Sequence, residues 1–277
     1  MNKEPQTGIY TTKMLLTQGI TLRQQQNLLQ QGKIWRVRHG WYASTNANPD
    51  AVRAVKAGGQ LGCISGCQQY GLWVPPGSAE KLHVLRHGMV RGITTETAEF
   101  HYLCGSLRSP LASLEECLLD VCRFHEVETG MIVLESAIYQ KFLDLEQAHI
   151  LLERLSEPKH ETYHFLSDQA ESGSETRVRY YLEKLGVAVH PQRNISGIGR
   201  VDLLVGKSLI IECDSRAHHT ADENYHRDRE RDMAAQMLGY RVIRLSFRHI
   251  WFDWAQTQAF LKRALRTRRH RKDPRPL

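Results

Sequence analysis

Three carboxylates and two imidazoles lie close together in the C-terminal third of this 277-residue chain. Asp202 lies on one apolar run, Glu212 and Asp214 lie on the next, and His218 and His219 follow. A bare carboxylate in an apolar strand is costly unless something pairs with it. Mg²⁺ is an efficient partner, because it takes one or two carboxylates and keeps waters for substrate phosphates, and such a site can activate water. The residue types therefore predict a Mg²⁺ site, with Mn²⁺ as a substitute, that hydrolyses phosphodiesters.

The length of the turn between the two runs decides whether these carboxylates meet. Side chains on a strand alternate between two faces, so Glu212 and Asp214 share one face. A two-residue loop would turn Asp202 to the opposite face, whereas a three-residue loop over residues 206–208 would set Asp202 opposite Glu212. The site therefore requires the longer loop or a bulge, because a slip of one residue reverses every side chain. The alternative is a hairpin whose polar face meets solvent or nearby arginines.

Residues 174–266 resemble the restriction-endonuclease-like superfamily, and most closely the domain family related to very-short-patch-repair endonucleases. In that family a helix with a Glu precedes a hairpin that carries an Asp and a Glu-x-Asp, and a His-His and a helix with Arg-Asp-Arg follow. Here that run is residues 227–229, and residues 239–244 match the family's third strand. The resemblance implies an αββαβα fold, divalent-metal-dependent DNA cleavage and a set of candidate catalytic residues. These residues are Glu175, Asp202, Glu212, Asp214, His218 and His219.

The chain departs from the family pattern at two positions. Asp214 stands where the wider superfamily usually has Lys, a change that the subfamily shares. Ser215 stands where the subfamily often has Gly, so the local backbone is expected to differ. Asp202 and Glu212, with Glu175 or Asp214, are expected to hold the metal.

Each candidate also has a purely structural explanation. Ser172-x-x-Glu175 is a capping-box pattern, so Glu175 could cap a helix, act in a site, or do both. His218 or His219 could polarise a phosphate or carry a proton, because imidazole titrates near neutral pH. Paired histidines after a strand could equally be hydrogen-bonded to loop backbone. The alternating charges of residues 227–232 are typical of a solvated helix face.

The first forty-odd residues have the pattern of a small DNA-binding module. Helices are predicted over residues 11–17 and 21–31, and Leu22, Leu28 and Leu29 are expected to face the core. Two short strands around Arg38-His39-Gly40 would then form a wing. The module resembles the winged helix-turn-helix of AbiE-type antitoxins through Gly32, Arg36, Arg38, Gly40 and Tyr42. Arg23, Gln24, Asn27, Arg36 and Arg38 are the predicted DNA-binding residues, since such side chains read base edges and contact phosphates. A protein-contact module with a solvated, Gln-rich helix is the alternative.

The middle of the chain, residues 49–166, carries no catalytic pattern. Apolar spacing predicts helices over residues 61–71, 113–124 and 131–142, with strands near 81–86 and 99–104. It resembles the middle region of the same antitoxin-like proteins. We expect it to bridge the two ends, or to contact a second copy of the chain or another protein. Residues 157–173 are predicted to be a linker.

Composition limits the compartment and the partners. Lys and Arg number 37 and Asp and Glu number 30, and residues 262–275 hold eight of the bases and one acid. The rest of the chain is formally neutral, so this basic tail is a candidate phosphate contact, or else a frayed terminus. Neither a signal region nor a membrane span is predicted, and the six cysteines lack a paired Cys-x2-Cys zinc signature. Buried free thiols in a reducing cytoplasm are the simplest account.

These expectations combine into one architecture and two functions. The chain is predicted to be α/β, with an N-terminal winged helix-turn-helix (1–48), a mixed α/β middle region (49–166) and a C-terminal restriction-endonuclease-like αββαβα domain (167–277). The first predicted function is a metal-dependent endodeoxyribonuclease in bacterial or prophage defence or in DNA repair. The other is a non-catalytic, antitoxin-like DNA-binding transcriptional regulator with a degenerate nuclease domain.

Overall fold

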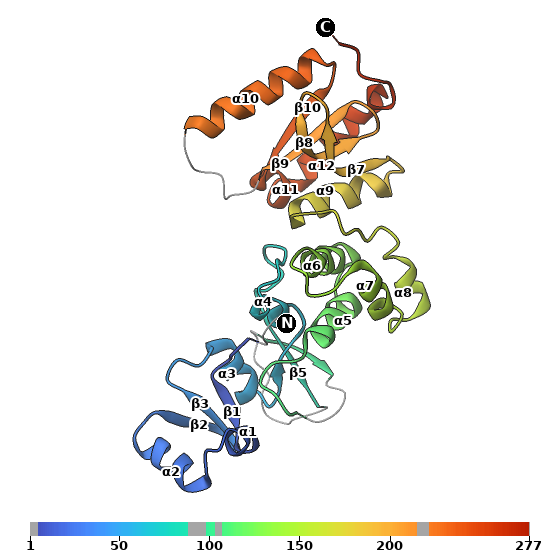
Figure 1. Ribbon diagram of the computed structural model, residues 1–277. Coiled ribbons are helices and arrows are strands. Elements are labelled where there is room, and N and C mark those ends of the chain that lie inside the picture. Colours follow the sequence, from blue (N-terminus) through green and yellow to red (C-terminus); the bar gives the residue numbers. More distant parts are fainter. Residues whose placement is uncertain (1–4, 88–97, 103–106, 215–221, 277) are drawn as a thin grey trace. The chain divides into compact units, whose positions relative to one another are not determined.

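A computed structural model describes residues 5–87, 98–102, 107–214 and 222–276 (Figure 1). The side chains of residue 214 and residues 222–228 are outside this description. The chain forms two compact units. Unit 1 consists of Met1–Val133 and Glu146–Glu161, and unit 2 consists of Leu134–Leu145 and Thr162–Leu277. The winged-helix and middle regions fall largely in unit 1, and their separation into two domains stays a prediction.

The first part of unit 1 is a small sheet with two helices, close to the predicted boundaries. Thr11 and Thr21 accept from backbone amides at the helix starts, each in a capping box. One core prediction was wrong: Leu22 is 59% exposed, and Gln25 is buried instead, where its amide donates to the Ile20 carbonyl. The strand order is β1-β3-β2. The elements are β1 (Ile9–Thr11), α1 (Thr12–Thr17), α2 (Leu22–Gln30), β2 (Ile34–Arg38) and β3 (Trp41–Ser44).

The middle region mixes a second small sheet with helices. The helix predicted over residues 61–71 is instead a short strand followed by a shorter helix. Gly62 lies between them with φ −157° and ψ −167°, and Leu61 pairs with Val84 of β5, so the backbone is extended where the helix was predicted to begin. β5 pairs parallel to β6 and antiparallel to β4. The elements are α3 (Pro49–Lys56), β4 (Gln60–Leu61), α4 (Cys63–Gln69), β5 (Leu82–Arg86), β6 (Ala98–Tyr102), α5 (Leu114–Phe124), α6 (Val127–Tyr139), α7 (Leu145–Leu152) and α8 (Glu157–Glu161).

The predicted linker, residues 157–173, is structured. It contains α8, and Tyr163, Leu166 and Ala170 are buried. Its polar composition hides these few apolar anchors, which is why the sequence pattern suggested a linker. The segment is therefore part of the packed structure rather than a tether.

Unit 2 contains a four-stranded mixed sheet in the order β10-β9-β8-β7. β10 runs parallel to β9, and the other two pairs are antiparallel. The sequence predicted an αββαβα order and missed β7, which contains Pro191. Proline is tolerated here because β7 is an edge strand, where one side of the backbone needs no sheet partner. The elements are α9 (Gly173–Lys184), β7 (Val189–Ile195), β8 (Gly199–Val205), β9 (Leu209–Asp214), α10 (Asp222–Met237), β10 (Arg241–Ser246), α11 (Phe247–Trp251), α12 (Trp254–Arg266) and the 3-10 turn η1 (Arg269–Arg271).

The two faces of this sheet pack against different helices. Ile211 and Cys213 belong to a core cluster that includes residues of α9, α11 and α12. Ile210 belongs to a separate cluster with Ala235, and Leu238 packs against it just beyond α10. By strand alternation Glu212 lies on the α10 side, on the face opposite Ile211 and Cys213, as the sequence predicts.

The basic C-terminal segment packs against the turn between β8 and β9. The Lys207 backbone amide donates to the His270 carbonyl at 2.6 Å, and the Ser208 hydroxyl donates to the Arg269 carbonyl. The Lys207 ammonium pairs with Asp273 at 2.9 Å. The described part of the tail is therefore docked rather than frayed.

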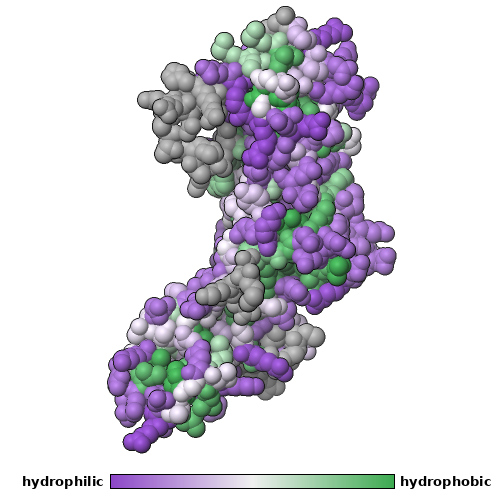
Figure 2. All heavy atoms as spheres, viewed as in Figure 1, coloured by the Kyte–Doolittle hydropathy of each residue, from purple (hydrophilic) through white to green (hydrophobic). Residues whose placement is uncertain are grey.

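The visible surface is largely hydrophilic, with hydrophobic residues interspersed (Figure 2). Among the described residues, every helix is too short or too polar to cross a membrane.

Candidate nuclease site

The turn between β8 and β9 has the length that brings two carboxylates together. Val205 pairs with Leu209, and Leu203 pairs with Ile211, so the loop holds three residues. Gly206 opens it with a φ of 60°, a conformation that favours glycine. This register sets Asp202 opposite Glu212, as the metal-site hypothesis requires.

Side-chain hydrogen bonds continue the strand pairing at this point. The backbone amide of Cys213 donates to Asp202 Oδ2 at 2.7 Å. The backbone amide of Asp202 in turn hydrogen-bonds the Glu212 carboxylate. The two carboxylates are thus held against each other's strands.

Glu175 lies at the first turn of α9 and is buried. The Ser172 hydroxyl donates to Glu175 Oε1 at 2.7 Å, and the Glu171 amide donates to Oε2 at 3.1 Å. Ser172 accepts from the Glu175 amide as the helix N-cap. Burial first, and then repulsion from Asp202, raise the Glu175 pKa. The Glu175 side chain therefore helps to cap α9 and is also repelled electrostatically by the Asp202 carboxylate on β8.

Gln192 on β7 is a site residue that the sequence did not indicate. Its Nε2 donates to Glu175 Oε2 at 2.8 Å. The β7–β8 register sets it opposite Asp202, between the Pro191–Leu203 and Arg193–Val201 pairs. Its φ is 50°, which is uncommon for a residue with a side chain and costs on the order of 1–3 kcal/mol. Such a conformation persists where the surroundings over-determine it, here beside two carboxylates.

The electrostatics of the site favour an added positive charge. Burial, and next the charge of Asp202, raise the Glu212 pKa to about 7. Arg231 of α10 lies 3.5 Å from Glu212 Oε1, at the long end for an ion pair. Arg244 stands beside Glu212 in the β9–β10 register, but its guanidinium makes two hydrogen bonds to Asp232. The local arginines therefore offset the acidic charge only in part.

The donor chemistry fits a hard divalent cation at Asp202 and Glu212. Both offer carboxylate oxygens, which are the ligands that Mg²⁺ and Mn²⁺ prefer. Both oxygens of Glu175 already accept hydrogen bonds, so this side chain fits a positioning or proton-accepting role better than a ligand role.

Three predicted site residues are only partly described or not described. Asp214 ends β9, with its backbone opposite Ser246 of β10. His218 and His219 lie outside the described residues, as does Ser215. The run at residues 227–229 lies on α10, as predicted.

The predicted DNA-contacting residues of unit 1 are exposed. Arg23, Gln24 and Asn27 lie on α2, and Arg36 and Arg38 lie on β2. The Gln24 side-chain oxygen is already occupied, because it accepts from the Thr21 amide and hydroxyl. Gln24 therefore has a structural role at the start of α2, whatever else it contacts.

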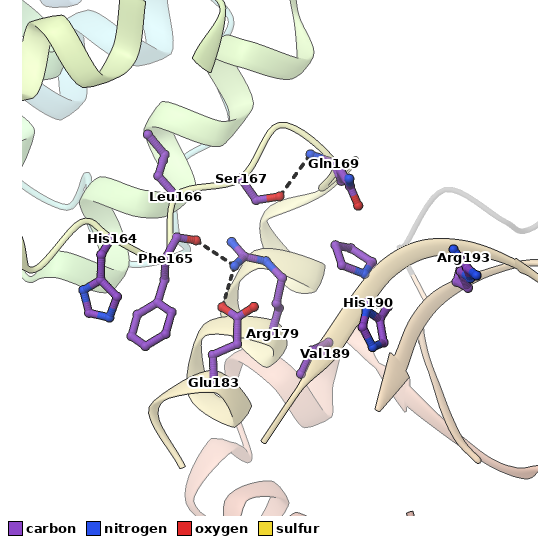
Figure 3. A pocket seen from close by; sticks show the side chains of 11 residues that line it. His164, Phe165, Leu166, Ser167, Gln169, Arg179, Glu183, Val189, His190 and Arg193 are labelled. Carbon is purple, nitrogen blue, oxygen red and sulfur yellow. Dashed lines mark hydrogen bonds and ion pairs between the residues drawn. The ribbon is translucent and has the colours of Figure 1, made fainter. Parts of the chain in front are cut away.

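A pocket of about 440 Å³ lies elsewhere on unit 2, between residues 164–169, α9 and the start of β7 (Figure 3). Arg179 crosses it, donating to the Phe165 carbonyl at 2.8 Å and to Glu183 at 2.6 Å. Arg179 also pairs with the buried Glu135. These contacts use the charge of Arg179 within the protein, and neither Asp202 nor Glu212 lines the pocket.

A family model and a solved structure are each similar to part of the chain. The family model REase_MTES_1575 matches residues 175–265. Residues 175–265 are therefore similar to restriction-endonuclease-like domains. A solved structure, the homing endonuclease I-Bth0305I catalytic domain, is similar at 21% identity and a TM-score of 0.30, over 36% of this chain and 97% of that chain. A search of the curated proteins finds no match.

The family match supports a nuclease-type function for the restriction-endonuclease-like domain in general terms. It begins at the helix that carries Glu175 and includes the whole hairpin and β10. It does not reach the first 174 residues, so the antitoxin-like assignment of unit 1 stays a prediction. The closer relationship to very-short-patch-repair endonucleases also stays a prediction.

Proposed function

We propose that the chain is a metal-dependent endodeoxyribonuclease that hydrolyses DNA phosphodiesters with Mg²⁺, or with Mn²⁺ in its place. One observation carries the proposal: the three-residue turn sets Asp202 opposite Glu212, where burial and mutual repulsion favour a cation. Asp202 and Glu212, with Asp214 as a further candidate, hold the ion. A bound divalent ion neutralises charge on the phosphate and lowers the pKa of a bound water.

The protein's own residues prepare the site for that chemistry. Ser172, Gln192 and the Glu171 amide fix the Glu175 carboxylate, and burial raises its pKa, which makes it a better proton acceptor than an ordinary carboxylate. Arg231 adds a guanidinium next to Glu212, where a phosphate would approach. His218 or His219 assists at the phosphate in this proposal.

Unit 1 brings the DNA target in the same proposal. Arg23 and Asn27 on the exposed side of α2 read base edges, with Gln24 contributing its side-chain amide nitrogen, and Arg36 and Arg38 on the wing contact phosphates. The resemblance to repair endonucleases and to AbiE-type antitoxins points to bacterial or prophage defence or to DNA repair. A second copy or a partner protein at the middle region belongs to the same proposal.

The test is DNA cleavage by the full chain. Supercoiled plasmid and single-stranded DNA are incubated with Mg²⁺, with Mn²⁺ or with chelator, and wild type is compared with Asp202→Asn and Glu212→Gln. Both variants should lose cleavage at least about 100-fold, and the double variant should be no worse, because both act through one ion. Glu230→Gln, at an exposed position of α10, is the matched control and should cleave like wild type.

DNA binding is measured in parallel by fluorescence anisotropy in chelator. Both site variants should bind as tightly as wild type or more tightly, since each removes a negative charge that faces phosphate. Cleavage by both variants at the wild-type rate would refute the proposal. Sequence-specific binding with no cleavage in either cation would favour the non-catalytic regulator instead.

A further inference from the structure

One cysteine and three histidines, residue types that commonly bind metals, lie close together within unit 1. They come from a different part of the sequence than Asp202 and Glu212. Cys63 begins α4, His83 lies on β5, His101 lies on β6, and His125 follows the last turn of α5. Their ligand atoms all lie within 4.8 Å of one another. Cys63, His83 and His101 are buried and His125 is partly buried. We propose that this cluster, the Cys63–His83–His101–His125 site, binds one structural Zn²⁺ ion.

The spacing of the four atoms fits a tetrahedral ion. Cys63 Sγ lies 3.2 Å from His125 Nε2, and His83 Nδ1 lies 3.0 Å from His101 Nε2. With Zn–N of ~2.0–2.1 Å and Zn–S of ~2.3 Å, tetrahedral ligand atoms stand about 3.3–3.6 Å apart. Small side-chain rotations therefore bring the four atoms to coordination distance.

The donor types select the metal. One thiolate and three imidazoles suit Zn²⁺, whereas Mg²⁺ requires oxygen ligands. All four positions of a tetrahedral ion are filled by protein, which is typical of a structural rather than a catalytic zinc site. The set is thus chemically distinct from the carboxylates Asp202 and Glu212 and calls for a different ion.

The surroundings supply the outer contacts that such a site needs. The His83 ring also hydrogen-bonds the Ser78 backbone, a contact of the kind that fixes the tautomer of a ligating imidazole. Glu99 acts electrostatically on all four groups, and Asp120 acts on Cys63. Asp120 is buried, and its Oδ2 has no hydrogen-bond partner. Arg123 lies 3.7 Å from the other carboxylate oxygen of Asp120, at the long end for an ion pair, and a dication at the cluster would add positive charge beside Glu99 and Asp120.

The burial of the four side chains and the backbone at Cys63 accompany this geometry. Burial lowers the pKa of each of the three imidazoles, the direction that favours the uncharged ring. Burial raises the pKa of the Cys63 thiol, and a coordinating metal deprotonates a thiol outright. Cys63 has a φ of 49°, a conformation that a cysteine rarely adopts without a requirement for its side chain there.

The first test is metal content. The full chain, expressed without a histidine tag and dialysed after exposure to zinc, should retain one Zn²⁺ per chain by elemental mass spectrometry, and Mg²⁺ should not displace it. Cys63→Ala should retain at least about tenfold less zinc. Cys67→Ala is the matched control, because Cys67 is an equally buried thiol one turn along α4 that is outside the cluster.

A second measurement uses wild type alone, so that it does not depend on a variant that folds. X-ray absorption at the zinc edge should show one sulfur at about 2.3 Å and three nitrogens at about 2.0–2.1 Å. Chelation should lower the thermal midpoint of unit 1, and Zn²⁺ but not Mg²⁺ should restore it. A wild-type protein without stoichiometric zinc, a sphere of oxygen donors, or full zinc retention by Cys63→Ala would overturn the proposal.

Discussion

Replacing Glu212 by Gln should stabilise unit 2 at alkaline pH and should change little at acidic pH. Burial and the charge of Asp202 raise the pKa of Glu212 from 4.5 to about 7 in the folded protein. The folded pKa lies above the unfolded value. Below about pH 4.5 the side chain is protonated in both states and does not oppose folding. As the pH rises from about 4.5 through about 7, the free energy of unfolding falls, because the folded protein resists ionisation of this side chain. Glutamine keeps the size of the side chain and removes its ionisation.

The magnitude follows from the same values. At ~1.4 kcal/mol per pKa unit, ionised Glu212 costs about 3 kcal/mol at pH 8 and less than about 1 kcal/mol at pH 5. The side chain is only 12% exposed, so solvent screening reduces this little. Glu212→Gln should therefore increase the free energy of unfolding by about 2–3 kcal/mol at pH 8.

The assay is urea unfolding of the full chain, followed by pulsed hydrogen exchange of peptides from β8 and β9, which report unit 2 alone. Glu230→Gln serves as the control, since that side chain is exposed. Mg²⁺ should stabilise wild type at pH 8 and should stabilise Glu212→Gln much less. An equal gain at pH 5 and pH 8, or a loss at pH 8, would show that the burial and repulsion argument is wrong.

Three further changes test other features of unit 2. Gly206→Ala should lower the free energy of unfolding by about 2–4 kcal/mol in urea titration. Residue 206 has a positive φ, and a Cβ there would lie 2.3 Å from the His270 carbonyl oxygen. A free energy of unfolding within about 0.5 kcal/mol of wild type would contradict the packing of the tail against this turn. Gln192→Ala should reduce cleavage about tenfold without changing the DNA Kd, because it removes the hydrogen bond to Glu175. Gln192→Gly should cleave equally poorly, but its free energy of unfolding should be about 1 kcal/mol higher than that of the Ala variant, because glycine tolerates the positive φ. Equal stability of the two variants would contradict the strain argument. Glu135→Gln should destabilise unit 2 by about 3 kcal/mol in the same titration, because it leaves the buried Arg179 with Glu183 as its remaining acidic partner. An unchanged free energy of unfolding would show that the Glu135–Arg179 pair does not stabilise the fold.

The hairpin and its flanking helices could be predicted because their signals are local. Strand alternation predicted that Glu212 lies on the opposite face of the sheet from Ile211 and Cys213, and Gly206 indicated the turn. The choice between a two- and a three-residue loop could not be made from the sequence, because both fit the same apolar runs. The contacts that accompany the longer loop come from residues 269–273, far along the chain.

The features that the sequence did not indicate depend on residues brought together from a distance. Gln192 lies in a polar run with a proline, which hides strand β7. Cys63 and His125 are 62 residues apart, and His83 and His101 are 18 apart, so no compact ligand spacing exists. The one available signal was a histidine inside each of two apolar strands, at His83 and His101, where a polar ring requires a partner.

The docked C-terminal segment has a consequence for how the hairpin folds. A two-stranded hairpin closes within about 1–10 μs, and its register depends on the turn, which Gly206 opens at a positive φ. The contacts of Lys207 and Ser208 with the tail span 66 and 61 residues, so they form late. In the observed three-residue loop, Lys207 contacts His270 and Asp273, and Ser208 contacts Arg269. The register of this hairpin is therefore stabilised from outside the hairpin, by a segment more than sixty residues further along the chain.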